Sequence, residues 1–272
     1  MTGVRFFFSC VVIYILATGS AQACGVDTNC QIGDRHYRIL MPEDYNSTEK
    51  IGALVWSHGY RGSASGMMKN KSMARLANQL GIALIATKSL RDDWDIPGTP
   101  SNVQSTGAAE FAYFDALIED VTTRFSIDPA RLVATGFSAG GMMVWNLACH
   151  RSQKFAGFIP IAGTFWEPTP EACKSEPASI VHIHGTEDRI VPLRGRKIAN
   201  TRQGDIFNVL EMYKMHGGYK SQSTTRDKDL SCENHLGESD EILNFCTFTG
   251  GHSFKSEYVR QGWEMLEAAG KL

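Results

Sequence analysis

Ser138 stands among glycines in "VATGFSAGGMMVWNLA", residues 133–148. The pentapeptide "GFSAG" (136–140) follows an apolar run typical of a strand and precedes a pattern typical of a helix. A turn tight enough to lift a serine hydroxyl above a sheet brings backbone segments so close that side chains at 136 and 140 would obstruct it. The alternative is an ordinary strand-to-helix turn with Ser138 as its N-cap. The flanking patterns and the partners downstream favour a nucleophile.

An acidic residue and a histidine later in the chain, Asp188 and His252, could activate such a serine. A serine hydroxyl needs a base to accept its proton and a third group to orient that base. In sheet-based hydrolases these partners follow in the order Ser, Asp or Glu, then His, each on a loop after a strand. Asp188 follows "ASIVHIHGTE" and His252 follows "LNFCTFTGG", whereas Asp240 precedes its strand and Glu187 is a less suitable neighbour. We predict Ser138, Asp188 and His252 as the catalytic residues.

The other histidines are expected to be structural. His182 and His184 alternate within a predicted buried strand, where His184 is expected to hydrogen-bond to nearby backbone. The remaining ones stand at the ends of elements or in polar loops: His36, His58, His150, His216 and His235.

The negative charge that develops on the substrate oxygen during acyl transfer needs two backbone N–H donors. One is expected from Ala139, the residue after the nucleophile. The other is expected from Tyr60, in the loop after the third strand, where Gly59 gives the backbone freedom to turn. His58 is expected to brace this loop rather than to react.

Strand-like apolar runs alternate with helix-like patterns along most of the chain. This alternation predicts an α/β fold with a mostly parallel central sheet that helices cover on both faces. In such sheets ligands bind beyond the carboxyl ends of the strands, where the three predicted catalytic residues fall. The predicted strands are 36–41, 52–58, 82–87, 131–137, 155–163, 178–185 and 241–248, and the predicted helices are 66–80, 107–125, 139–149, 204–216 and 254–269.

Residues 1–23 have the pattern of a signal peptide. Arg5 precedes an apolar stretch, 6–16, and the segment closes on Ala21-Gln22-Ala23, a small-x-small cleavage site. A membrane span needs about 20 apolar residues, more than this run provides. We therefore expect a secreted or periplasmic protein in which 24–272 form a single domain; the alternative, a lipoprotein modified at Cys24, is disfavoured by alanine at position 21.

The charge of the mature chain points to no polyanionic partner. Without residues 1–23, whose only charged residue is Arg5, the chain has 26 Lys and Arg against 29 Asp and Glu, a net charge of −3. This balance indicates neither nucleic acid nor an anionic membrane surface as a partner. No second hydrophobic segment has the length of a membrane span, so none is expected after signal cleavage.

Six cysteines remain after Cys10 leaves with the signal peptide. An even number in an exported chain indicates disulfides, although six cysteines allow 15 pairings. We expect nearest neighbours to pair, as Cys24–Cys30, Cys149–Cys173 and Cys232–Cys246. Because no two cysteines have C-x-x-C spacing, we expect no metal site, and nothing in the sequence indicates a cofactor.

Four segments resemble, in this order, the polyhydroxybutyrate depolymerase and feruloyl esterase-like group of secreted α/β-hydrolases: "SHGYRGSASG", "GFSAGG", "HGTEDRIVP" and "GGHSF". The similarity runs from about residue 34 to the end. It implies the α/β-hydrolase fold and gives the roles of nucleophile, acid and base to Ser138, Asp188 and His252, as above. The segment 91–99 resembles the group's aromatic loop after the fourth strand, which implies that Trp94 lies beside the substrate.

The sequence departs from the group at two places. Tyr60 stands where the group often has cysteine, and Phe254-Lys255 stand where it often has Trp-Pro. These departures leave the predicted triad intact and concern the substrate.

The connection between Ile161 and Ser179 is too short for a large lid. It has about 18 residues and, with its flanks, four prolines from Pro160 to Pro177, so it offers no mobile apolar lid of the kind that lipases insert there. We expect an open groove suited to a polymer chain or a bulky aromatic acid. Four aromatic residues are predicted to line it: Trp94, Phe137, Phe165 and Trp166.

We expect a serine esterase that acts through an acyl-enzyme on a small ester or an ester linked to a polymer or polysaccharide. The candidates are a short hydroxyalkanoate oligomer, a hydroxycinnamate and an acetylated polysaccharide. One alternative is a serine peptidase of the prolyl-oligopeptidase type, which usually carries an additional domain for which this sequence offers no segment. The other is a non-catalytic binding protein on the same fold, which would not need all three triad positions filled.

Overall fold

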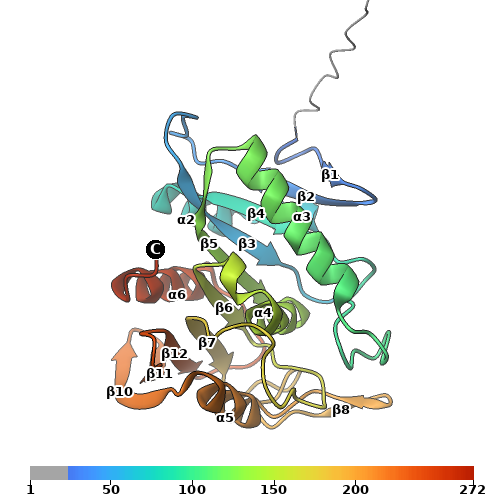
Figure 1. The fold of residues 1–272 in the computed structure, drawn as a ribbon, viewed down its shortest axis with the longest axis vertical. Coiled ribbons are helices and arrows are strands. Elements are labelled where there is room, and N and C mark those ends of the chain that lie inside the picture. Colours follow the sequence, from blue (N-terminus) through green and yellow to red (C-terminus); the bar gives the residue numbers. More distant parts are fainter. Residues whose placement is uncertain (1–23) are drawn as a thin grey trace, which may run out of the picture.

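The structure, a computed structural model, describes residues 24–272, so the predicted signal peptide lies outside the described residues. These residues form a ten-stranded sheet flanked by helices (Figure 1). The sheet strands are β1 (Cys30–Ile32), β2 (Arg35–Leu40), β3 (Ile51–Ser57), β4 (Ala83–Thr87), β5 (Ile127–Phe137), β6 (Gly157–Ile161), β7 (Ile180–Gly185), β10 (Lys220–Asp227), β11 (Leu230–Leu236) and β12 (Ile242–Phe248). The helices are α1 (Ala64–Met68), α2 (Lys71–Leu80), α3 (Ala108–Arg124), α4 (Ala139–His150), α5 (Ile206–Gly217) and α6 (Ser256–Ala268).

The strand order is β1-β2-β4-β3-β5-β6-β7-β12-β11-β10. Strands β4, β3, β5, β6, β7 and β12 run parallel, and the strands at both edges run antiparallel to their neighbours. The prediction of a mostly parallel sheet is therefore confirmed. From β3 the chain first adds β4 on one side and then β5 to β7 on the other, so the strand order reverses beside β5, the strand that ends next to Ser138. A ligand site is expected at such a reversal.

Helices cover both faces of the sheet, as predicted. The residues of β3 alternate between two cores: Ala53 and Val55 pack on one face, Leu54 and Trp56 on the other. The first core includes side chains of α3, α4 and α5, and the second includes side chains of α1, α2 and α6. Figure 1 shows β1 and β10 at opposite edges of the sheet.

The helix predicted over 66–80 is two helices, α1 and α2. Asn70 separates them, because its side-chain Oδ1 accepts hydrogen bonds from the backbone N–H groups of Ser72 and Met73, each at 3.1 Å, and so caps a new helix.

The antiparallel edge formed by β10 and β11 was not predicted. Every residue of β10 is exposed and its sequence, "KSQSTTRD", has no apolar alternation. Only β11 carries an alternating pattern, with Leu230 and Cys232 buried. The alternation of apolar and polar residues, on which strand prediction depends, is thus missing from β10, one of the two strands of the hairpin.

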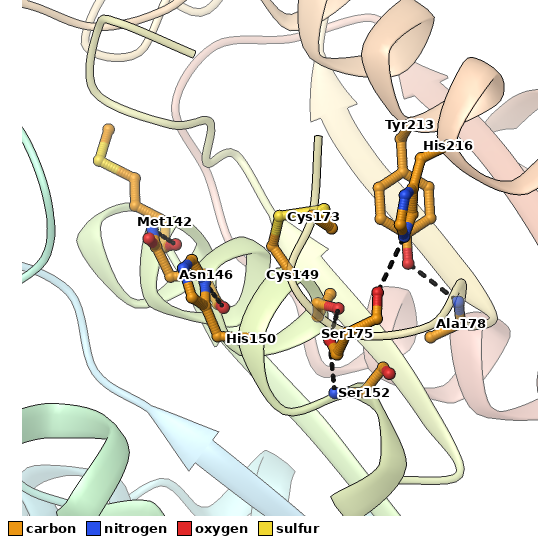
Figure 2. Close-up of a disulfide and its surroundings, with 11 residues drawn as sticks. Met142, Asn146, Cys149, His150, Ser152, Cys173, Ser175, Ala178, Tyr213 and His216 are labelled. Atoms are coloured by element: carbon orange, nitrogen blue, oxygen red, sulfur yellow. Dashed lines mark hydrogen bonds between the residues drawn. A yellow bond between two sulfur atoms is a disulfide. The ribbon is translucent and has the colours of Figure 1, made fainter. Parts of the chain in front are cut away.

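The three expected disulfides are present: Cys24–Cys30, Cys149–Cys173 and Cys232–Cys246. The second ties the C-terminal end of α4 to the connection between β6 and β7 (Figure 2). Cys149 O accepts hydrogen bonds there from the N–H groups of Lys174 and Ser175, at 2.9 and 3.2 Å. The third joins directly facing residues of β11 and β12.

These disulfides predict that residues 24–272 contain no free thiol. Alkylation without reductant, followed by mass measurement, is expected to label no cysteine, and two or more labelled cysteines would contradict the pairing. Reduction is expected to lower the free energy of unfolding by about 2–4 kcal/mol per bridge in the chain-entropy model. Reduction of Cys232–Cys246 is also expected to lower ester turnover, since β12 leads directly into the loop of His252.

The short connections also bear on the site. The connection 162–179, between β6 and β7, contains no helix. A two-stranded hairpin, β8 (Lys197–Ile198) and β9 (Thr201–Arg202), stands instead in the connection between β7 and α5. Within residues 24–272, no helix has both the length and the apolar character that a membrane span requires.

Candidate active site

Ser138 lies in a strained turn between β5 and α4. Its backbone has φ 60° and ψ −123°, and its N–H donates to Ile161 O at 2.9 Å. A β-carbon on Gly140 would lie 1.9 Å from Ser57 O, and one on Gly136 would lie 2.6 Å from Gly140 O. The glycines are therefore required by contact between the end of β3 and the turn, as the sequence predicted. Strain of about 1–3 kcal/mol at such a residue persists only where the surrounding structure imposes it.

Asp188 follows β7, and its side chain is fully buried. Oδ1 accepts hydrogen bonds from the N–H groups of Ile190 and Val191, at 2.8 and 2.9 Å. Oδ2 accepts from His252 Nδ1 at 2.7 Å and lies 3.4 Å from His184 Nε2. Burial alone would raise the pKa of Asp188, but these donors outweigh it and hold the pKa well below its ordinary value. The carboxylate therefore stays ionised and can orient a histidine.

His252 follows β12, and its side chain is 14% exposed. Its ring packs on that of Phe137, the residue before Ser138, with centroids 4.5 Å apart. Because Nδ1 donates to Asp188, the lone pair is on Nε2 and is free to accept a proton. Among residues 24–272 no hydrogen bond joins this Nε2 to Ser138 Oγ. Such bonds often tighten only when substrate is bound.

Backbone contacts hold the loop after β7, which carries Asp188, and the loop after β12, which carries His252, together. Thr186 N donates to Phe248 O at 2.9 Å, and Glu187 N donates to Gly250 O at 2.8 Å. A β-carbon on Gly185 would lie 2.5 Å from Gly250 O, so the two loops meet without side chains between them. The distance from Asp188 to His252 is thus set by main-chain geometry.

The loop after β3 passes over the turn that carries Ser138. A β-carbon on Gly59 would lie 3.3 Å from Phe137 O and 3.5 Å from Ser138 Cβ. Tyr60 and Ala139 line the same cavity as Ser138. Neither of their backbone N–H groups has an acceptor among the described residues, which leaves both available to a ligand oxygen.

His58 braces this loop, as predicted. Ser89 N donates to His58 Nε2 at 3.1 Å, so the ring hydrogen is on Nδ1 and donates to Gly59 O at 2.7 Å. Trp94 Nε1 donates to His58 O at 2.7 Å. Burial lowers the pKa of His58 to about 4. A neutral imidazole therefore holds the peptide that precedes Tyr60.

The buried His58 predicts that stability falls on mild acidification. An exposed histidine in the unfolded chain takes up a proton below about pH 6.5, whereas native His58 stays neutral until about pH 4. The unfolded state thus binds more protons in this window, and the free energy of unfolding is expected to fall by up to about 3 kcal/mol as the pH drops through it. Urea denaturation at pH 7 and at pH 5 measures the change.

His58→Gln is the matched variant, because glutamine keeps one donor and one acceptor but does not titrate. Its stability is expected to fall less than that of the wild type between pH 7 and pH 5. Equal losses in the two proteins would contradict the role given to His58.

The cavity beside Ser138 has a volume of about 510 Å³. Its walls combine apolar side chains with a few polar groups: Tyr60, Asp93, Pro100, Ser101, Ala139, Met142, Trp166, Ile190, Val191, Arg196, Ile198 and Gln203. A second cavity, of about 690 Å³, is lined by Glu167, Thr169, Asn200 and neighbouring residues and contains none of the predicted catalytic residues. The first cavity is therefore the candidate substrate site.

Of the four aromatic residues predicted to contact substrate, only Trp166 lines this cavity. The prediction for Trp94 is wrong, because its side chain is fully buried and its indole N–H is bound to His58 O. Phe165 is buried against Trp145, with ring centroids 5.9 Å apart. Phe137 packs on His252 instead of facing the cavity.

The wall formed by the β8–β9 hairpin was missed from the sequence. Arg196 Nε donates to Ile190 O at 2.8 Å and to Gln203 Oε1 at 3.3 Å, which ties the base of the hairpin to the loop after β7 that carries Asp188. Gln203 also forms a backbone bridge with Trp166. The only signal in the sequence was the unexplained length of the connection between Asp188 and the next helix.

Residues 94–231, half of the chain, match the phospholipase/carboxylesterase family, and this range contains Ser138 and Asp188. NocK of Nocardia uniformis subsp. tsuyamanensis is 29% identical over 142 residues, which are 52% of this chain and 41% of NocK. The probable feruloyl esterase C of Aspergillus niger is 25% identical over 255 residues, which are 88% of this chain and 86% of that protein. The chain thus spans less than half of NocK and most of the Aspergillus relative.

Among solved structures, the acetyl xylan esterase from Aspergillus awamori superposes with a TM-score of 0.62 at 14% identity, over 85% of this chain and 94% of that one. This likeness shows that the ten-stranded sheet and its helices form the α/β-hydrolase fold. The resemblance to feruloyl esterase-like α/β-hydrolases that the sequence predicted is confirmed.

Proposed function

The chain belongs to the phospholipase/carboxylesterase family of serine hydrolases, and from this we propose that it is a secreted esterase with Ser138, Asp188 and His252 as its catalytic triad. One observation carries the proposal. His252 Nδ1 donates to the buried Asp188 carboxylate at 2.7 Å, while its ring packs on the residue before the strained Ser138. A nucleophile, a base and an orienting acid on adjacent loops are the parts that acyl transfer needs.

The proposed reaction has two halves. Ser138 Oγ attacks the ester carbonyl carbon and its proton passes to His252 Nε2, while the Asp188 carboxylate stabilises the imidazolium. The oxyanion accepts hydrogen bonds from the N–H groups of Tyr60 and Ala139. Collapse of this intermediate expels the alcohol, which takes the proton from His252. Water then attacks the acyl-enzyme with His252 as base, releasing the acid and restoring the serine.

We propose an ester of a hydroxycinnamate, a short hydroxyalkanoate or an acetylated polysaccharide as the substrate. Met142, Trp166 and Ile198 give the cavity an apolar wall, and its volume of about 510 Å³ suits an acyl group of this range. The names of the relatives, a feruloyl esterase and an acetyl xylan esterase, support the same group of substrates. The connection 162–179 adds no helix that would cover the cavity.

Secretion or export to the periplasm is proposed on two grounds. The three disulfides require an oxidising compartment, and residues 1–23 have the pattern of a cleaved signal peptide. Residues 24–272 are then the mature enzyme, which we propose to be a single domain.

A hydrolysis panel tests the proposal. The substrates are p-nitrophenyl acetate and octanoate, methyl ferulate, hydroxybutyrate oligomers and a peptide anilide, each with the wild type and Ser138→Ala. We expect the wild type alone to hydrolyse esters and to leave the anilide intact. Preferred cleavage of the anilide would instead make the protein a peptidase, and no turnover of any substrate by the wild type would leave a binding protein.

A further inference from the structure

Three buried side chains form a continuous hydrogen-bonded line behind Asp188. Trp145 Nε1 of α4 donates to His182 Nδ1 at 3.2 Å, and His182 Nε2 lies 3.0 Å from His184 Nδ1. His184 Nε2 lies 2.7 Å from Val191 O and 3.4 Å from Asp188 Oδ2. Trp145, His182 and His184 are all fully buried. The line therefore exchanges no hydrogen bonds with solvent.

The hydrogen-bond partners allow only one tautomer for each of the two histidines, His182 and His184. An indole N–H can only donate, so His182 Nδ1 accepts and the ring hydrogen of His182 is on Nε2. That hydrogen points to His184 Nδ1, which places the hydrogen of His184 on Nε2, facing Val191 O and Asp188 Oδ2. Burial, followed by the neighbouring His184, keeps the pKa of His182 well below its ordinary value, so this ring stays neutral.

The opposite arrangement is excluded at both ends. It would direct the Trp145 N–H at another N–H, and it would turn a ring lone pair toward both the Val191 carbonyl and the Asp188 carboxylate. Among the described residues, His182 and Asp188 are the titratable groups that form a hydrogen bond or an ion pair with the His184 ring nitrogens. The donor that faces Asp188 is thus fixed by the hydrogen-bond partners of His182 and His184.

The hydrogen-bonded line ends at Asp188 Oδ2, the carboxylate oxygen that also accepts from His252. Asp188 Oδ1 is occupied by two backbone N–H groups, so Oδ2 alone serves both His252 and His184. His184 also holds Val191 O, whose residue donates its N–H to Oδ1. The ring therefore contacts both the carboxylate and the turn that carries it.

We propose that His184, fixed by His182 and Trp145, is a positioning residue for ester hydrolysis. It keeps Asp188 Oδ2 aimed at His252 Nδ1 and draws part of the carboxylate charge away from that hydrogen bond. Because Trp145 lies on α4, the helix that begins directly after Ser138, the line also connects this helix with the loop that carries Asp188. The inference rests on the proposed triad.

His184→Phe and His184→Gln separate this role from simple core packing. Phenylalanine removes the donor, so kcat/KM for p-nitrophenyl acetate is expected to fall about tenfold, mostly in kcat. With one donor fewer, Oδ2 attracts the proton on His252 more strongly, and the acid limb of the kcat/KM profile is expected to move to higher pH. Glutamine, which keeps a donor and an acceptor, is expected to restore most of the rate and the position of the limb.

Tyr219→Phe is the matched control. It removes another buried hydrogen bond, from the Tyr219 hydroxyl to Ala178 O at 2.8 Å, which involves neither Asp188 nor His252. We expect an unchanged pH profile in this variant. An acid limb in His184→Phe that stays in place or moves to lower pH would overturn the proposal, as would a glutamine variant no better than the phenylalanine variant.

The wild-type protein gives a second test that no folding defect can obscure. Nitrogen-15 NMR of the imidazoles at pH 7 is expected to show the ring hydrogen of His182 on Nε2 and that of His184 on Nε2, as the hydrogen-bond partners require. A hydrogen on His184 Nδ1 at this pH would overturn the proposal. Ester turnover by the wild type, lost in Ser138→Ala, tests the proposed function separately, because the NMR result does not depend on it.

Discussion

Ser138→Ala and His252→Ala are each expected to lower kcat for ester hydrolysis by about 10⁴- to 10⁶-fold. Alanine at 138 removes the atom that forms the acyl-enzyme, and alanine at 252 removes the base that accepts its proton. The double variant is expected to be no slower than either single variant, because the members of a triad act as a unit. Initial rates with p-nitrophenyl acetate at a known protein concentration measure the effect.

The fold is expected to survive both changes. The Ser138 side chain makes no cap hydrogen bond to α4, and the His252 side chain is partly exposed. Urea denaturation is therefore expected to give Ser138→Ala a free energy of unfolding within about 1 kcal/mol of the wild type, and His252→Ala a larger loss of about 1–3 kcal/mol, because the buried Asp188 carboxylate loses a donor. Near-normal turnover by a folded Ser138→Ala protein would refute the mechanism.

Asp188→Asn is expected to behave differently from its two partners. Each carboxylate oxygen accepts from at least one N–H, so an amide NH₂ in that site must face a donor. The variant should lose stability as well as turnover, with a smaller loss of turnover than in Ser138→Ala. Glu187→Gln, a change at the adjacent and exposed acid, is the control and is expected to leave both quantities near their wild-type values.

The sequence could predict where Ser138, Asp188 and His252 lie, because each directly follows a strand of the parallel sheet. Each follows a strand whose apolar run is unmistakable in the sequence, and the carboxyl ends of parallel strands share one edge. The sequence also predicted close backbone contacts at Gly136 and Gly140, because a side chain at either position would collide with neighbouring backbone. These features depend on local pattern and chain order alone.

The cavity wall depends on contacts that no local pattern reports. Arg196 and Ile198 reach the cavity because a hairpin of two-residue strands folds back over it. Strands this short show no periodicity. The hairpin is held by the hydrogen bond from Arg196 Nε to Ile190 O and by the bridge between Gln203 and Trp166, and this bridge joins segments far apart in the sequence.

The error at Trp94 has a similar cause. The resemblance placed the loop 91–99 at the site correctly, but it gave no information on which side chains of the loop point inward. Asp93 faces the cavity, whereas the next residue points into the core and donates to His58 O. Burial of a large aromatic ring next to a binding site stabilises the loop that carries it, without any contact between the ring and the ligand.

Trp94→Ala is accordingly expected to lower the free energy of unfolding by about 3–5 kcal/mol and to slow hydrolysis of every ester by a common factor. The cavity left by the indole loosens the peptide between His58 and Gly59, which leads into the N–H of Tyr60. Trp94→Phe keeps most of the volume and removes only the hydrogen bond, so it is expected to be less destabilised and still slower on all substrates alike.

Trp166 provides the contrast, because its ring lines the cavity. Trp166→Ala is expected to lower kcat/KM for methyl ferulate and p-nitrophenyl octanoate more than for p-nitrophenyl acetate, whose acyl group is too small to reach that wall. The ratio of kcat/KM values between substrates reports this discrimination directly, whatever the amount of active protein. A ratio that changes in Trp94→Phe and not in Trp166→Ala would return the substrate contact to Trp94. If Trp94 only supports the loop that carries Tyr60, Trp94→Phe slows all substrates equally and leaves the ratio of their kcat/KM values unchanged.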